Sequence, residues 1–120
     1  MSNLKNRVQL IGHLGNDPEI VKFDSGKSKA SFRMATSENF KNGSGEWVNE
    51  TQWHNIVAWG GLVDKIERIK LGKGAEIALQ GKISTRTYDD TDGNRKYFTE
   101  ISMDAFELLN KSKEQQAQAS

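Results

Sequence analysis

Two tryptophans, Trp53 and Trp59, lie six residues apart in one largely apolar run of the sequence. If that run is a strand, its side chains alternate between two faces, so both indoles and the Asn55 amide share one face. The opposite face carries Ile56 and Ala58 and can pack against a core. A face with two flat indoles and an amide suits a flat aromatic ligand, and nucleic-acid bases fit that description.

Other aromatic residues have cations close to them in the sequence. Lys41 follows Phe40, and Arg86 precedes Tyr88 by two residues. Single-stranded nucleic acids bind to such surfaces because bases stack on the rings while Lys and Arg contact the phosphates, and each stacked base contributes roughly 1–3 kcal/mol. Any one of these rings could equally be an ordinary core or interface residue. Taken together, their polar neighbours favour exposure and therefore a binding surface.

Catalytic and metal-binding groups are scarce in this sequence. His13 and His54 are the only histidines, there is no cysteine, and His54 fits a packed or interface position within a strand. Asp89, Asp90 and Asp92 lie close together, but the ligand spacing and closing Glu of a calcium loop are absent, so a solvated hairpin tip is expected. We therefore expect no enzymatic activity, no cofactor and no metal.

The overall composition sets broad limits on the protein. A chain of 120 residues is most simply one domain. The formal net charge is only +1, so any binding of a polyanion depends on where the cations lie. There is no apolar run long enough to span a membrane and no visible signal peptide. We therefore expect a cytoplasmic protein.

The hydrophobic periodicity predicts an all-β fold with one short helix. Strands are expected over residues 7–12, 30–36, 52–59, 77–83 and 97–103, with a brief extended pair at Val21 and Phe23. Leu62, Ile66 and Ile69 have helical spacing. Turns are expected at 24–26, 42–45 and 89–94. A helix between strands 3 and 4 of a five-stranded barrel is the oligonucleotide/oligosaccharide-binding (OB) fold, although other small half-open barrels would give a similar pattern.

The domain is expected to comprise residues 1–109. Residues 110–120 are polar and cannot bury much apolar area, so we expect a disordered C-terminal tail.

Five segments of the chain resemble the bacterial single-stranded DNA-binding protein family. They keep their order and spacing over residues 5–107 and comprise 8–19 (VQLIGHLGNDPE), 32–38 (FRMATSE), 51–60 (TQWHNIVAWG), 73–83 (KGAEIALQGKI) and 93–101 (GNRKYFTEI). The resemblance implies an OB-fold that assembles as a homotetramer. It also implies a nucleoid-associated protein that binds single-stranded DNA without sequence preference in replication, recombination and repair. The residues themselves leave the choice between DNA and RNA open.

The resemblance also implies which residues contact DNA. It assigns base stacking to Phe40, Trp53, Trp59 and Tyr88, phosphate contacts to Arg7, Lys73 and Arg86, and a subunit contact to His54. We add Arg33, Lys41 and Trp47 to the expected DNA-binding set.

The chain departs from the family at several of its positions. The family usually has Trp at positions 40 and 88 and Phe at 59, and these exchanges keep an aromatic face. Trp47, expected in the loop before the third barrel strand, is not a family feature and is either an extra stacking platform or a loop anchor. Four positions where relatives often carry a cation hold Val21, Asn55, Gly61 and Thr87.

The C-terminal residues also differ from the family pattern. Relatives typically end in an acidic tip closing on Phe, which recruits replication and repair proteins. Residues 110–120 carry no such tip, so recruitment by the tail is not expected.

Two other interpretations remain open. A primosomal relative of the same fold would recruit a helicase and tends to be a dimer. A protein-interaction module would use its aromatics as subunit contacts, and its fluorescence would not respond to oligonucleotides.

Overall fold

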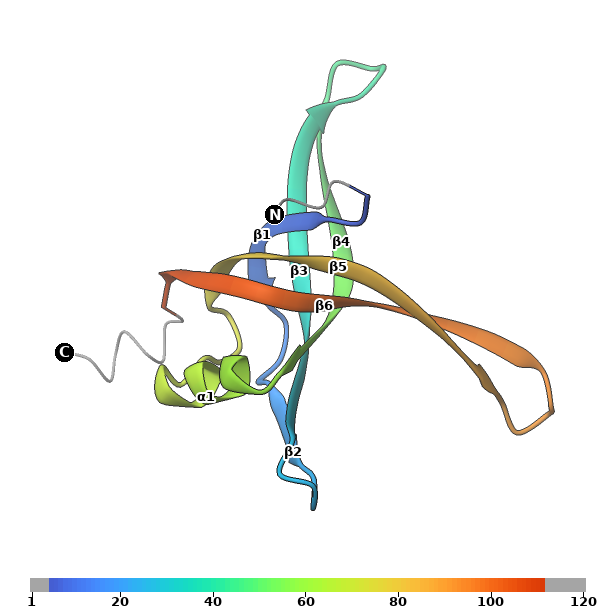
Figure 1. The fold of residues 1–120 in the computed structure, drawn as a ribbon. Coiled ribbons are helices and arrows are strands. Elements are labelled where there is room, and N and C mark those ends of the chain that lie inside the picture. Colours follow the sequence, from blue (N-terminus) through green and yellow to red (C-terminus); the bar gives the residue numbers. More distant parts are fainter. Residues whose placement is uncertain (1–4, 112–120) are drawn as a thin grey trace.

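The computed structural model describes residues 5–111 as six strands and one helix. In chain order these are β1 (Val8–Leu14), β2 (Glu19–Lys22), β3 (Ser28–Lys41), β4 (Trp47–Trp59), α1 (Gly61–Arg68), β5 (Glu76–Asp89) and β6 (Arg95–Asn110). The predicted fold is confirmed, because five strands form the barrel and α1 lies between its third and fourth strands, β4 and β5 (Figure 1). The short β2 pairs with β3, at the edge of the sheet.

The barrel closes because β1 pairs on both of its sides. The strand order is β1-β5-β6-β4-β3-β2, and β1 pairs with β3 as well as with β5. His13 lies opposite Ala35 and Leu14 opposite Met34 at this closing contact. The pair β4–β6 is parallel and the other pairs are antiparallel.

The core forms where apolar residues alternate along the barrel strands. Phe32 and Met34 of β3 point inward together with Ile56 of β4, and all three are buried. Val63 and Ile66 of α1 join the same cluster. This packing fixes the orientation of each strand, because a shift of one residue would turn every apolar side chain outward.

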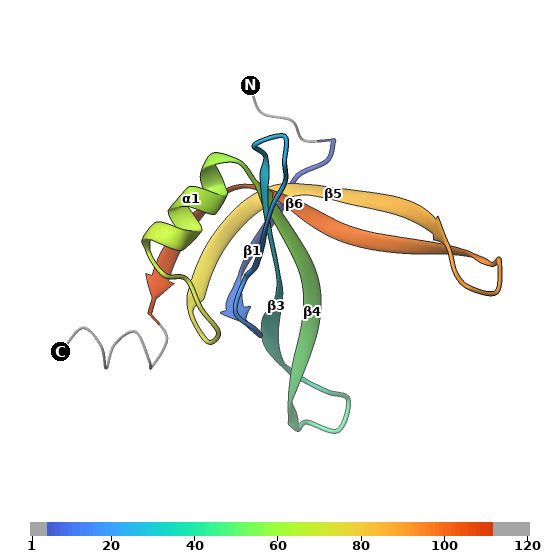
Figure 2. The ribbon, with the colours of Figure 1, turned by 90° about the horizontal axis from the view of Figure 1, so that it is seen from below.

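Two long ribbons extend beyond the barrel. The outer halves of β3 and β4 form one, and the outer halves of β5 and β6 form the other (Figures 1 and 2). The strands are therefore longer than predicted. Most side chains on both faces of a ribbon are exposed, so the alternation that marks a half-buried strand is lost there. The predicted tail begins at Asn110, which is the last residue of β6, and residues 112–120 of that tail lie outside the described residues.

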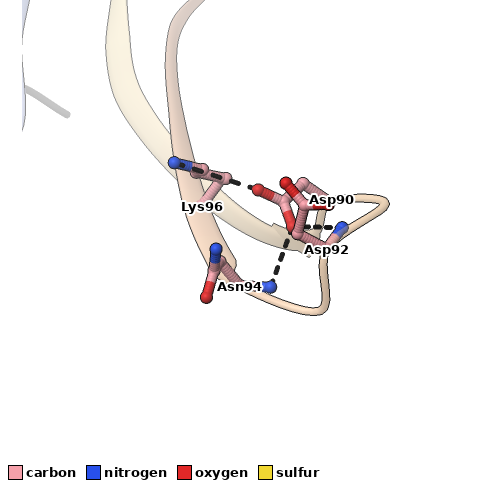
Figure 3. Close-up of polar contacts among 4 residues, drawn as sticks. All are labelled: Asp90, Asp92, Asn94 and Lys96. Carbon is pink, nitrogen blue, oxygen red and sulfur yellow. Dashed lines mark hydrogen bonds and ion pairs between the residues drawn. The ribbon is translucent and has the colours of Figure 1, made fainter.

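Both ribbon tips are closed by a side-chain acceptor, as the predicted turns require. Asp90 Oδ1 accepts the backbone N–H groups of Asp92 at 3.0 Å and Asn94 at 2.8 Å, and the Lys96 ammonium lies 3.9 Å from Asp90 Oδ2 (Figure 3). At the other tip Asn42 accepts two N–H groups in the same way. Asp90 therefore acts as a turn cap, and residues 5–111 contain no group of three potential metal-ligating side chains.

Substituting Asp90 by alanine is expected to loosen the β5–β6 tip. Two hydrogen bonds are removed, at roughly 0.5–1.5 kcal/mol each. Hydrogen exchange should therefore accelerate at two backbone amides of the tip. The N–H of residue 90 donates to the Asn94 carbonyl, and the N–H of Gly93 donates to the carbonyl of residue 90. Asp92→Ala is the matched control because it keeps both bonds to Asp90. Equal exchange rates in the two variants would contradict the capping role.

Candidate nucleic-acid interface

A groove of about 360 Å³ lies on the outer face of the barrel, between β3–β4 and the base of the β5–β6 ribbon. Its lining combines aromatic rings with charged and amide side chains. These come from β3 (Arg33), from β4 (Trp53 and Asn55) and from the β5–β6 ribbon (Arg86, Phe98 and Glu100). The structure thus brings together three residues of the predicted set, Arg33, Trp53 and Arg86.

Trp53 is held in place from two directions while half of its surface stays exposed. The Arg33 guanidinium carbon lies 4.8 Å from the indole centroid. The ring edge rests on the backbone of Gly15, where an added Cβ would lie only 2.4 Å from Trp53 Cζ3. Gly15 is tied to β3 because its N–H donates to the Arg33 carbonyl at 2.8 Å. A residue without a side chain at position 15 therefore leaves room for the indole.

Trp59 is the last residue of β4 and is 47% exposed. Its ring stacks with Phe23 at a centroid distance of 6.1 Å and an interplanar angle of 19°. The Lys29 ammonium lies 5.7 Å from its centroid, across the strand pair. Sequence reasoning missed both neighbours, because Phe23 looked like the end of a brief strand and Lys29 becomes a partner only through the register.

The predicted sharing of one face by Trp53 and Trp59 is confirmed. Ile56 and Ala58 are buried in the core, whereas both indoles are exposed on the outside. The register between β3 and β4 is unbroken over 13 residue pairs, so the faces do not exchange along the ribbon.

Arg86 and Tyr88 occupy one face of the β5–β6 ribbon, since they are two residues apart in a strand. The Arg86 guanidinium carbon lies 5.0 Å from the Phe98 centroid, and Nη2 lies 3.6 Å from a Glu100 carboxylate oxygen. Tyr88 is 52% exposed. Phe98 and Glu100 were missed by the sequence analysis. The sequence did contain a signal that could have identified Phe98, because it is an aromatic residue on the polar face of the predicted strand.

Phe40 lies on the opposite face of the β3–β4 ribbon from Trp53. It pairs with Val48, and its parity along β3 matches that of the inward-facing Phe32 and Met34. It is nevertheless 42% exposed, because the ribbon extends beyond the core. The four predicted stacking rings are thus all accessible to a ligand, but they do not share one surface.

The remaining predicted residues lie away from the groove. Arg7 donates a 2.8 Å hydrogen bond to Gln80 on the outer side of β1–β5. Lys73 lies in the loop after α1, where its backbone N–H donates to Asp17. His54 is half-buried and its Nε2 lies 3.0 Å from Thr36 Oγ1, a contact within the chain. A subunit contact at His54 remains a prediction.

Trp47 and Lys41 lie at the tip of the β3–β4 ribbon. Trp47 is the first residue of β4, so its assignment to the preceding loop is wrong.

Among the described residues α1 is the sole helix, and it is too short to cross a membrane.

Comparison with known proteins gives consistent matches over most of the chain. Single-stranded DNA-binding protein 1 of Chlorobaculum tepidum is 47% identical over 105 residues, covering 87% of this chain and 64% of the relative. The single-stranded DNA-binding protein of Bacteroides thetaiotaomicron is 40% identical over 107 residues, covering 88% and 66%. The chain thus spans less than two thirds of the length of these curated relatives.

The fold also matches a solved structure, the Plasmodium falciparum SSB in complex with ssDNA. The TM-score is 0.81 at 27% sequence identity, with coverage of 92% of this chain and 99% of the other. The single-strand binding protein family matches residues 5–109. This chain therefore belongs to the single-strand binding protein family.

Proposed function

We propose that this chain binds single-stranded DNA without sequence preference and protects it during replication, recombination and repair. The observation that carries this proposal is the outer face of β4, where Trp53 and Trp59 are exposed and each has a β3 cation near its ring. Such a face offers stacking to bases and positive charge to the backbone at the same sites.

Stacking explains both the tolerance of sequence and the preference for single strands. Every base has an aromatic face, so an indole accepts any of the four. In a duplex these faces are already covered by neighbouring bases, and they become available to Trp53 only when the strands separate. The function requires no catalytic step, and we propose that the chain acts as a binder rather than an enzyme.

Within the proposed site, Trp53, Trp59 and Tyr88 stack bases, and Arg33 and Arg86 contact phosphates. Arg86 is more than half exposed in its pair with Glu100. The Glu100 side chain is only 17% exposed, so a phosphate that binds the exposed guanidinium must compete with this carboxylate.

Phe40, Arg7, Lys73 and Lys41 remain proposed contacts outside the groove. A strand that stacks on both Trp53 and Phe40 must pass around the edge of the β3–β4 ribbon, because the two rings lie on opposite faces.

The groove cations are expected to set the salt dependence of binding. Substituting both Arg33 and Arg86 by glutamine should make the slope of log K against log[salt] less steep by roughly 0.7 for each phosphate that is no longer neutralised. The matched control is Lys22→Gln, because Lys22 pairs with Glu67 of α1 and does not line the groove. Titrations at several salt concentrations measure the slopes. A change as large in the control as in the double variant would refute the assignment.

We also propose a homotetramer that acts in the cytoplasm at the nucleoid. Family membership supports this, as does Ile11 on the outer side of β1, which is 54% exposed and suits burial against another copy. Native mass measurement tests the assembly, and a mass of two chains would favour a primosomal-type dimer instead.

The direct test of function is anisotropy titration of labelled oligo-dT with unlabelled competitors. Unlabelled single strands should displace the probe at far lower concentration than duplex of the same length. Competition by duplex at equal concentration, or no binding at all, would overturn the proposed function.

A further inference from the structure

Three tryptophans are evenly spaced along one face of β4. Trp47, Trp53 and Trp59 are separated by six residues each, an even number that keeps them on the same face of the strand. Six residues of strand span about 20 Å, at roughly 3.3 Å per residue. All three rings are accessible, and Trp47 is the most exposed, at 71%.

Each of the three indoles has a β3 cation near it. The distances to the ring centroids are 5.8 Å from Lys41 to Trp47, 4.8 Å from Arg33 to Trp53 and 5.7 Å from Lys29 to Trp59. Lys41 and Lys29 lie directly opposite their indoles in the register, whereas Arg33 reaches its indole diagonally. The outer face of β3–β4 therefore carries three pairs of ring and cation.

The loop before Trp47 closes without help from this ring. Asn42 donates its N–H to the Glu46 carbonyl at 2.9 Å, and its side-chain oxygen accepts from the N–H groups of Ser44 and Glu46. A loop anchor would be expected to bury its side chain, and Trp47 does not. Of the two roles that the sequence left open for Trp47, the geometry favours the stacking platform.

The two faces of this ribbon differ in charge. Glu38 and Glu50 lie directly opposite each other on the face that also carries Phe40 and Val48, and both carboxylates are exposed. The Trp47 face carries Lys41 and, between the tip and the barrel, neutral side chains such as Asn39 and Ser37. A phosphate backbone leaving the groove along this ribbon is therefore attracted to the tryptophan face and repelled from the other.

We propose that Trp47 and Lys41 form a third stacking site on the β4 face, which extends the path of single-stranded DNA from the barrel groove to the tip of the β3–β4 ribbon. This inference rests on the proposed function and specifies where the strand runs. The three indoles together span about 40 Å of strand β4. At the duplex spacing of about 3.4 Å per nucleotide that length holds at most on the order of 12 nucleotides, within the range of roughly 4–16 for a single OB-fold.

The cation near each ring has a defined role in this arrangement. An exposed cation–π contact is weak, so the Lys41 ammonium leaves the indole when a base arrives and binds the adjoining phosphate. The base then takes the ring face that the ammonium had covered.

The test is the dependence of the Trp47 contribution on oligonucleotide length. Labelled oligo-dT of roughly 4 to 16 nucleotides is titrated with the full chain and with Trp47→Ala. Short oligomers, which the barrel groove accommodates, should bind the two proteins equally. The longest should bind Trp47→Ala roughly tenfold more weakly, within the range expected for one stacked base, while Trp47→Phe should retain most of the affinity.

A substitution next to Trp47 distinguishes the effect of losing the indole ring from a general effect on the ribbon tip. Val48→Ala alters the other face of the same tip, opposite Phe40, and should not reproduce the length-dependent loss that Trp47→Ala causes. Lys41→Gln should make the salt slope less steep by roughly 0.7, with long oligomers only.

Each alternative result identifies a different error. If the full chain binds well and Trp47→Ala matches it at all lengths, the third site is refuted and the proposed function stands. An equal loss of affinity for short and long oligomers also refutes it, because Trp47 would then act through the fold. If the full chain binds no oligomer, the proposed function fails and the third site fails with it.

Discussion

Replacing Trp53 and Trp59 together by alanine is expected to weaken oligo-dT binding by about 2–6 kcal/mol, the sum of two stacking contributions of roughly 1–3 kcal/mol. The contributions should add because the two residues are six positions apart on one strand, about 20 Å, and sites that far apart are usually independent. Anisotropy titration of the two single variants and the double variant measures the affinities.

The weakening should occur without unfolding. Both indoles lie outside the core cluster and are about half exposed, so their removal leaves the barrel packing intact. The matched control is Tyr97→Ala. Tyr97 is a more exposed ring on the ribbon face opposite Arg86, and its removal should cost less affinity. If the double variant bound like the unmodified chain, stacking on β4 would be excluded.

Substituting Gly12 by alanine is expected to lower the free energy of unfolding by about 1–3 kcal/mol or more, the usual cost of overpacking a core. An added Cβ would lie 2.1 Å from the Ala35 carbonyl oxygen and 3.1 Å from Met34 Cε. The first of these atoms is backbone, and it belongs to Ala35 of β3, which lies opposite His13 where β1 closes the barrel. The strands must therefore move apart to admit one methyl group. Urea unfolding measures the change.

Gly43 provides the control for this substitution. It lies at the β3–β4 tip, and a Cβ added there meets nothing within 4 Å. Gly43→Ala should therefore leave the unfolding midpoint almost unchanged. Equal midpoints for Gly12→Ala and Gly43→Ala would show that the closing contact tolerates a side chain.

The elements that could be predicted are those that pack on a core. Ile56 and Ala58 of residues 52–59 are buried in the core, and the period of two along this strand correctly placed Trp53 and Trp59 on the opposite face. The helical spacing of Leu62, Ile66 and Ile69 correctly predicted a short helix here, and α1 spans Gly61–Arg68. In both elements one face is buried, and burial is what produces a periodic pattern.

The ribbons could not be predicted in the same way. Beyond residue 36 of β3 no side chain is buried, so the expected strand ended too early. That error also concealed the face of Phe40, which follows from its parity with Met34 only if β3 is continuous to Lys41. Trp47 was placed in a loop for the same reason.

The neighbours of Trp53 and Trp59 could be identified only from the three-dimensional structure, which shows how the strands pair. Lys29 and Phe23 are far from Trp59 in sequence, and Gly15 is far from Trp53. Local patterns contain no information about such pairs. The resemblance to relatives supplied Arg7 and Lys73, which the structure separates from the groove.

The most direct test of base stacking on the β4 face uses Trp53 as the sole tryptophan, in a chain carrying Trp47→Phe and Trp59→Phe. Titration with oligo-dT should quench the Trp53 emission and saturate at the same concentration as the anisotropy of a labelled strand, whereas duplex should have little effect. Tight binding by anisotropy with unchanged Trp53 emission would contradict the account, because the strand would then lie elsewhere on the protein.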